Sequence, residues 1–207
     1  MNKYLILFFL FIANTAFAQY KPVPGNDAFR SQFTAASSGI NTISADFTQV
    51  KTLAVLSEKL TSKGKFYFKK ENQVRMEYTS PYQYLMVING SKVSIKDGSK
   101  TTTMSARSNK MFQQINQLMM DCMRGTVFEN KNFSVRLFED ADTYLAEMTP
   151  VTKQMAGLFK KVNVIMNKNS FIVSRVQMFE PSGDYTSMNY SNQKLNASLP
   201  DALFTIK

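Results

Sequence analysis

Few side chains of this chain could take part in covalent or metal chemistry, because its 207 residues include no histidine and only one cysteine, Cys122. The chain therefore has no imidazole to act as a general base. This excludes the usual hydrolase triad and the usual zinc sites, which need histidine. Cys122 lies in the sequence Met-Met-Asp-Cys-Met, with no histidine to activate its thiol. We therefore expect a small buried hydrophobe and not a nucleophile. A single cysteine also excludes an internal disulfide.

The acidic side chains suggest little chemistry either. Glu139, Asp140 and Asp142 cluster near the end of a predicted strand, where carboxylates could hold calcium. The loop lacks the ligand spacing and the glycine of known calcium motifs, so a solvated acidic turn is favoured. Paired carboxylates for sugar hydrolysis stay open, since the partners of such a pair can be remote in sequence, but no feature points to them. We expect no enzyme, no metal and no cofactor.

The amino-terminal residues 1–18 predict a cleaved leader. Lys3 supplies a positive start, residues 4–13 form an apolar core, and Ala16-Phe17-Ala18 has the small-x-small spacing that a signal peptidase accepts. An uncleaved anchor is the rival interpretation, but the apolar stretch is shorter than the roughly 20 residues that a spanning helix needs. Cleavage leaves Gln19 and not cysteine at the new terminus, which argues against lipid attachment there. We expect an exported, soluble protein with a single domain over residues 19–207.

The formal charge is +10, and it falls by one when Lys3 leaves with the leader. The basic residues are spread without a block, and those at polar strand positions fit a solvated sheet face. Attraction to anionic membranes or acidic partners is the functional alternative. Because there is no arginine-rich or aromatic-stacking pattern, nucleic acid is not an expected partner. The strand lysines concerned are Lys63, Lys65, Lys69, Lys92, Lys96 and Lys100.

The region between residues 47 and 98 predicts a meander of short antiparallel strands. Asn89-Gly90 and Asp97-Gly98 favour the positive φ angles of tight hairpins, and Pro81 ends one strand before the next begins. Apolar and polar residues alternate along residues 60–69, which is the period of a half-buried sheet. The strands expected here are residues 47–49, 64–70, 74–78, 84–88 and 93–96.

More strands are expected after this meander. Their patterns and turn residues place them at residues 101–106, 133–139, 144–149, 159–166, 171–179, 185–190 and 203–206. Roughly ten or eleven strands are too many for an open sheet to stay flat. The sequence therefore predicts a mainly β (α+β) protein whose antiparallel sheet is strongly curved or forms a barrel.

Two helices accompany these strands. The first can be capped by Asn26 or Asp27, carries Phe29 and Phe33 on one apolar stripe and ends near Gly39. The second spans residues 108–123 and has a broad apolar face. A third, short turn is expected at residues 151–158. The apolar face of the second helix contains Met111, Phe112, Ile115, Leu118, Met119, Met120, Cys122 and Met123.

Methionine is frequent in this chain. Of the 13 methionines only Met1 belongs to the leader, and four fall within residues 111–123. The methionine side chain is flexible and polarisable, so it suits surfaces that repack around variable guests. A sheet lined with phenylalanine and methionine beneath such a helix could open to admit acyl chains. An ordinary packed core, in which the helix simply plugs the sheet, is the alternative, and the composition leaves both open.

The order of the motifs resembles a known family. After an amphipathic first helix come Phe47-Thr-Gln49, then Gly64-x-Phe-x-Phe-Lys-Lys70-x-Asn72-x-x-Arg75-x-x-Tyr78-x-x-Pro81, then Val87-Ile-Asn-Gly90 and Lys96-Asp97. Together they resemble the periplasmic outer-membrane lipoprotein carrier family, the LolA-like proteins. The resemblance implies an incomplete, strongly curved antiparallel β-barrel of about eleven strands, with an N-terminal helix and lid helices that enclose an apolar cavity.

The resemblance also implies a function and partners. The cavity of such a carrier takes the acyl chains of a lipoprotein that an inner-membrane transporter releases, and the cargo passes to an outer-membrane acceptor. We therefore expect a periplasmic, monomeric chaperone. A paralogue that carries another envelope lipid and an envelope-stress sensor that binds lipoproteins are alternatives. A lipid hydrolase is the enzyme alternative, and it would need a base other than histidine, such as a lysine beside a serine.

Some positions depart from the family pattern. The family commonly has an Arg-Pro pair where this chain has Lys70-Glu71, and the resemblance implies that the arginine bonds the lid helices. Lys70 keeps the charge without the planar fork of arginine, and we expect it to latch the lid. Tryptophan positions of the family fall on Met76 and on Val93 or Ser94. The residues expected to bind lipid are Phe47, Phe66, Phe68, Val74, Met76, Tyr78, Tyr84, Met86, Ile88, Phe112, Ile115 and Met119.

Overall fold

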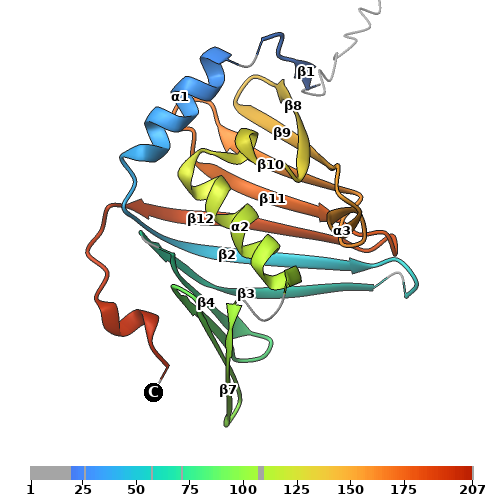
Figure 1. Cartoon of the computed structure of the whole chain (residues 1–207). Helices are drawn as coiled ribbons and strands as arrows, with labels where there is room; N and C mark the ends of the chain where they lie inside the picture. Colours follow the sequence, from blue (N-terminus) through green and yellow to red (C-terminus); the bar gives the residue numbers. More distant parts are fainter. Residues whose placement is uncertain (1–19, 26, 57, 71, 107–109, 207) are drawn as a thin grey trace, which may run out of the picture.

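Figure 1 presents the computed structural model of the chain, which describes residues 20–206 except 26, 57, 71 and 107–109, and of residues 110–112 the backbone only. The expected leader lies outside the described residues. The strands are β1 (Lys21–Pro22), β2 (Thr42–Leu53), β3 (Glu58–Lys69), β4 (Gln73–Ser80), β5 (Tyr84–Asn89), β6 (Lys92–Asp97), β7 (Lys100–Ser105), β8 (Phe133–Glu139), β9 (Thr143–Pro150), β10 (Lys161–Asn167), β11 (Val173–Phe179) and β12 (Tyr185–Leu195). The helices are α1 (Asp27–Ser38), α2 (Lys110–Arg124) and α3 (Lys153–Ala156), with two short 3₁₀ helices, η2 (Val127–Glu129) and η3 (Asp201–Phe204).

The strands form one twelve-stranded antiparallel sheet in the order β1-β8-β9-β10-β11-β12-β2-β3-β4-β5-β6-β7. Within the described residues the order is linear, with β1 and β7 at its two edges, so the sheet does not close into a barrel. This confirms the predicted incomplete antiparallel barrel. Its strands number twelve because the two-residue β1 pairs with β8 through Lys21 and Pro22.

The hairpins of the meander follow from their turn residues. Gly90 and Gly98 have φ angles of +59° and +56°, in the left-handed region that a tight hairpin requires. Residues 84–105 accordingly form the uninterrupted hairpins β5–β6 and β6–β7. The first predicted strand, residues 47–49, is only the middle of β2. The whole of β2 pairs with β3, over twelve positions from Thr42 to Leu53.

One predicted strand is wrong. Residues 203–206 were expected to be extended, but Asp201–Phe204 form the 3₁₀ helix η3. The neighbouring strands β4 and β5 are already paired along both edges, so no free edge is left for another strand. The carbonyls of Leu203 and Phe204 instead accept hydrogen bonds from the side chains of Arg75 and Asn89, at 3.0 and 3.2 Å.

Two other strands begin later than predicted. Strand β10 begins at Lys161, because the amide of Phe159 donates to the carbonyl of Met155 and extends the turn of α3. Strand β11 begins at Val173, because Phe171 has a φ angle of +57° and its amide donates to the carbonyl of Asn167. These local turns override the apolar pattern that suggested earlier strand starts.

The helices α1 and α2 lie on the same face of the sheet, α2 across its middle strands and α1 near one end (Figure 1). The apolar stripe of α1 packs inward, with Phe29 and Phe33 buried in the core. Phe66, Phe68 and Val74 on the sheet are also fully buried in this core. The helices therefore cover the apolar face that the alternation of the strands creates.

Candidate functional site

A cavity of about 150 Å³ lies beneath α2, between the β4–β5 part of the sheet and the β10–β12 part. Six of its fourteen lining residues are methionines and the others are mostly aliphatic. A surface of this kind binds apolar guests and can repack around them. The lining residues are Met76, Met86, Ile88, Ile115, Asn116, Leu118, Met119, Cys122, Met123, Val162, Val176, Met178, Met188 and Tyr190.

Strand pairing explains why side chains from distant parts of the sequence meet there. Met76 lies directly opposite Met86 in the β4–β5 pair, and Val176 lies opposite Met188 in the β11–β12 pair. Directly paired residues point to the same face of an antiparallel sheet. On α2, Ile115, Leu118, Met119 and Cys122 recur at helical spacing and face the sheet. The apolar face of the strands, which repeats every second residue, thus lies opposite the apolar face of α2, and the cavity lies between them.

The structure brings five of the twelve predicted lipid-binding residues together around this cavity: Met76, Met86, Ile88, Ile115 and Met119. Phe47, Phe68 and Val74 are buried in the core and do not line it. Phe66 lines a second cavity, whereas Tyr78 and Tyr84 line a more polar hollow with Glu77 and Lys96. The side chain of Phe112 lies outside the described residues.

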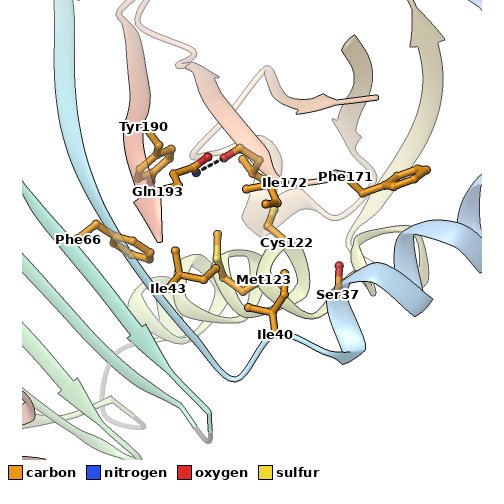
Figure 2. A pocket seen from close by; sticks show the side chains of 11 residues that line it. Ser37, Ile40, Ile43, Phe66, Cys122, Met123, Phe171, Ile172, Tyr190 and Gln193 are labelled. Atoms are coloured by element: carbon orange, nitrogen blue, oxygen red, sulfur yellow. Dashed lines mark hydrogen bonds between the residues drawn. The ribbon is translucent and has the colours of Figure 1, made fainter. Parts of the chain in front are cut away.

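The second cavity is small, about 20 Å³, and lies where the ends of α1 and α2 approach the sheet. Figure 2 shows its lining side chains, with Ile40 and Ile43 on one side, Tyr190 on the other and Met123 between them. The side-chain amide of Gln193 donates to the carbonyl of Val173 at 2.7 Å across its rim. Cys122, Met123 and Tyr190 line both cavities. These three side chains therefore form a wall that separates the two spaces.

The two ionisable groups that line the cavities, the thiol of Cys122 and the hydroxyl of Tyr190, are neutral at physiological pH. Burial, with a smaller contribution from Asp121, raises the pKa of Cys122 to about 12. Burial likewise raises the pKa of Tyr190 far above its ordinary value, and it raises that of Tyr78 to about 12. The hydroxyl of Tyr78 donates to Oε1 of Gln49 at 2.9 Å. Acid–base or nucleophilic chemistry at these groups is therefore disfavoured, and Cys122 is a buried thiol with little thiolate character.

The carboxylate of Asp121 is kept apart from the cavity by its own partners. It is 7% exposed and accepts hydrogen bonds from the side chains of Gln117 at 2.7 Å, Asn130 at 2.5 Å and Thr126 at 3.3 Å. The amide of Thr126 also donates to the carbonyl of Asp121 at 2.9 Å. These bonds fix the carboxyl-terminal end of α2 to the segment that follows it.

The β3–β4 turn contacts the carboxyl-terminal ends of both helices. The ammonium group of Lys70 donates to the carbonyl of Ser38, the last residue of α1, at 2.6 Å. The guanidinium of Arg124, the last residue of α2, donates to Oδ1 of Asn72 at 2.8 Å. Lys70 was singled out from the sequence as a latch, whereas Arg124 was not. A cation in the last turn of a helix is the usual signal for such a contact.

Nine of the fourteen lining residues are absent from the predicted set, and five of these nine lie on sheet strands outside residues 47–97, where the sequence motifs are concentrated. The missed residues of the sheet are Val162, Val176, Met178, Met188 and Tyr190. The alternation of Thr186, Met188 and Tyr190 with polar neighbours marks them as one face of β12. That face was readable from the sequence, but its position opposite β4 and β5 depends on the curvature of the whole sheet.

The acidic loop is closed by its own chain. Oδ1 of Asp140 accepts hydrogen bonds from the amides of Asp142 and Thr143 at 2.9 and 2.7 Å, and Glu139 pairs with Lys168 at 2.6 Å. The chain has no histidine, and within the described residues no cluster of acidic or cysteine side chains could hold a metal ion. Among those same residues, no helix is both long enough and apolar enough to cross a membrane.

Comparisons with known proteins agree with this architecture. Residues 38–207 match the family described as outer membrane lipoprotein carrier protein LolA. An outer-membrane lipoprotein carrier protein of Methylibium petroleiphilum is 26% identical over 162 residues, which cover 78% of this chain and 76% of that protein. A protein of the same name from Methylococcus capsulatus is 24% identical over 167 residues, covering 79% and 76%. The Pseudomonas aeruginosa MucA/MucB complex structure matches at a TM-score of 0.53 and 9% identity, over 87% of this chain and 60% of that one, which shows a shared fold alone.

Proposed function

Because the chain belongs to the LolA family of outer membrane lipoprotein carriers, we propose that it carries lipoproteins between membranes with their acyl chains enclosed beneath α2. The observation that carries the proposal is the apolar, methionine-rich cavity between α2 and the two parts of the sheet. Moving one methylene out of water contributes about 0.8 kcal/mol, so ten methylenes contribute about 8 kcal/mol. A lipoprotein cannot leave a membrane for water unless a carrier covers chains of that length.

The size of the cavity implies that it widens to take cargo. An apolar cavity of about 150 Å³ in a protein core holds a guest of about the size of benzene. Sites for larger ligands occupy about 300–1,000 Å³. Helix α2 therefore moves away from the sheet, or its methionines rearrange, before a whole acyl chain can enter. The six methionines of the lining favour such a rearrangement, since their side chains change shape at little cost.

The same proposal assigns a place and partners. After removal of residues 1–18, the domain of residues 19–207 works as a monomer in the periplasm. It receives lipoproteins from an inner-membrane transporter and passes them to an outer-membrane acceptor. The two relatives are named outer-membrane lipoprotein carrier proteins, which supports lipoproteins as the cargo and the outer membrane as their destination. Cargo of another lipid class is the alternative that the Lys70-Glu71 pair raises.

Binding is tested by one substitution in the cavity and one outside it. Met86→Glu places a carboxylate among the apolar residues of the lining, so it should abolish binding of a fluorescent acylated peptide. Val151→Glu is the matched control, because Val151 is 60% exposed and does not line the cavity. Circular dichroism reports whether both variants fold. Unchanged binding by folded Met86→Glu would refute the assignment of the cavity.

Transport is tested in cells. Depletion of the protein should leave lipoproteins in the inner-membrane fraction, and the purified protein should carry lipoproteins that mass spectrometry identifies. Normal lipoprotein distribution after depletion would contradict the transport role. Recovery of another lipid in the purified protein would redirect the proposal to that cargo.

A further inference from the structure

Two residues that line the cavity beneath α2, Asn116 and Tyr190, carry polar groups whose partners are poor or missing. Oδ1 of Asn116 is excluded from solvent and has no hydrogen-bond partner among the described residues. The hydroxyl of Tyr190 donates to the thioether sulfur of Met188 at 3.9 Å, a long bond to a weak acceptor. The other lining groups, apart from the thiol of Cys122, are apolar.

Such an arrangement is unfavourable in the empty cavity. A buried oxygen without a donor has lost its hydration and gained nothing in return. An aliphatic side chain of similar size at position 116 would remove this penalty. Its neighbours Ile115 and Met119 are apolar and line the same cavity, so such a side chain would fit the lining. A ligand that brings a hydrogen-bond donor to Oδ1 of Asn116 as the cavity widens would satisfy this oxygen, which gives the asparagine a role that a purely apolar lining lacks.

The chemistry of the two groups indicates the ligand that satisfies both. Asn116 Oδ1 is an acceptor and requires a donor, whereas the neutral Tyr190 hydroxyl is a donor and requires an acceptor better than sulfur. An amide offers an N–H and a carbonyl. An ester offers a carbonyl without a donor, so it can satisfy Tyr190 but leaves Asn116 unpaired.

We propose that Asn116 makes the cavity selective for acyl chains attached through an amide over acyl chains attached through an ester. The inference rests on the proposed function, since it requires that acyl chains enter the cavity beneath α2. It adds a selection among lipids to the apolar binding. The acylated peptide end of a lipoprotein provides amide N–H groups beside its chains, and an ester-linked glycerolipid backbone does not.

The test uses two ligands that differ in a single group. One is a dodecanoyl dipeptide amide, and the other is its depsipeptide, in which an oxygen replaces the N–H of the acyl amide. The wild-type protein should bind the amide about tenfold more tightly, equivalent to about 1.4 kcal/mol. Isothermal titration calorimetry of the purified protein measures both affinities.

Three variants separate the contributions. Asn116→Leu should abolish the amide preference or reverse it, because the acyl N–H of the amide ligand then enters the cavity without an acceptor. Gln114→Leu is the matched control: Oε1 of Gln114 on the same helix is also unpaired, but the residue does not line the cavity, so the tenfold preference should persist. Tyr190→Phe should weaken both ligands alike, because both carry a carbonyl.

The melting temperature of the free protein tests the role of Asn116 without any ligand. Asn116→Leu should raise the melting temperature of the free protein, as removal of an unpaired buried oxygen does. Equal binding of the two ligands by the wild type, or a full preference retained by folded Asn116→Leu, would overturn the inference and leave the carrier function standing. Failure of both ligands to bind the wild type would overturn the two proposals together.

Discussion

Gly64 shows how one residue sets the close packing of the apolar face. A Cβ atom at this position would lie 2.1 Å from the carbonyl oxygen of Glu77 and 2.7 Å from a ring carbon of Phe47. Neither group can move easily, because the oxygen belongs to the β4 backbone and Phe47 is 2% exposed. Gly64→Ala should therefore lower the free energy of unfolding by about 2–4 kcal/mol in urea denaturation.

The matched control is another glycine with room around it. A Cβ atom at Gly39 would find only the carbonyl oxygen of Ala36, at 4.0 Å. Gly39→Ala should change stability by less than about 1 kcal/mol, and the change should be stabilising if the unfolded chain loses freedom. Equal stability of the two variants would mean that the β3–β4 backbone yields more readily than its contacts suggest.

Glu147 gives the sheet a pH-dependent contribution. Burial alone would raise the pKa of its carboxyl, but hydrogen bonds and charges from Lys161 and Arg136 outweigh burial and lower it. A lowered pKa stabilises the fold above the ordinary carboxyl value, and this stabilisation is lost as the pH falls. Glu147→Gln should cost about 1–2 kcal/mol at pH 7 and less at pH 3. Urea titrations at both pH values measure the difference, and an equal loss at both would contradict the charge-based account.

At the scale of elements, turn chemistry was predictable and distant contacts were not. Asn89-Gly90 and Asp97-Gly98 placed two hairpins correctly, because each turn depends on its own residues. The segment at residues 201–204 failed, because its carbonyls are held by Arg75 and Asn89, more than a hundred positions earlier. A local pattern of apolar residues cannot contain that information.

For the candidate cavity, too, the local periodicity of the sequence was predictive and the contacts between distant elements were not. The periodicity of β4, β5 and α2 identified Met76, Met86, Ile88, Ile115 and Met119 as inward-facing, and these residues line the cavity. It did not distinguish them from Phe47, Phe68 and Val74, which share the alternation but are covered by neighbouring side chains. Periodicity gives the face of a strand, and the position along that face depends on where α2 crosses it.

The junction of the β3–β4 turn with α1 and α2 makes Lys70 a candidate latch at the element scale. The bond from Lys70 to the carbonyl of Ser38 satisfies one of the last acceptors of α1. Lys70→Met should speed amide hydrogen exchange in the last turn of α1, while the stability of the whole protein changes by less than about 1 kcal/mol, because the bond is exposed.

Lys92→Met is the control for the loss of charge, since Lys92 is an exposed lysine at the start of β6. Mass spectrometry after hydrogen exchange compares the two variants with the wild type. A latch also predicts faster exchange of a bound fluorescent acyl ligand in Lys70→Met than in Lys92→Met. Identical exchange at α1 in the two variants would exclude Lys70 as a latch.

For the whole molecule, the proposed opening would involve both parts of the sheet, because the cavity is bounded by β4 and β5 on one side and by β10–β12 on the other. The linear strand order leaves the sheet open at β1 and β7 in the described structure, so within the sheet these parts are joined through β2 and β3. Helix α2 lies across the middle strands that connect them (Figure 1). Movement of α2 or a change in sheet curvature would therefore enlarge the cavity.

Cys122 reports this opening, since it is the only cysteine and lines the wall between the two cavities. It is 6% exposed and its pKa is raised to about 12. Compared with an unperturbed thiol, this reduces the thiolate fraction at pH 8 by roughly a thousandfold, and burial blocks the reagent as well. Labelling by a thiol reagent should therefore be about a hundredfold or more slower in the folded protein than in urea, and it should occur through opened molecules. A dodecanoyl peptide that occupies the space beside Cys122 should slow it further.

The control moves the thiol to the surface. In Cys122→Ser/Ser170→Cys the new thiol stands at an exposed position in the β10–β11 turn, so its labelling should be fast and independent of the peptide. Slower labelling of Cys122 with peptide, and unchanged labelling of the control, would link acyl binding to the space beneath α2. If the peptide binds but leaves Cys122 labelling unchanged, the acyl chain lies elsewhere, because a chain in this cavity must contact the wall that the thiol helps to form.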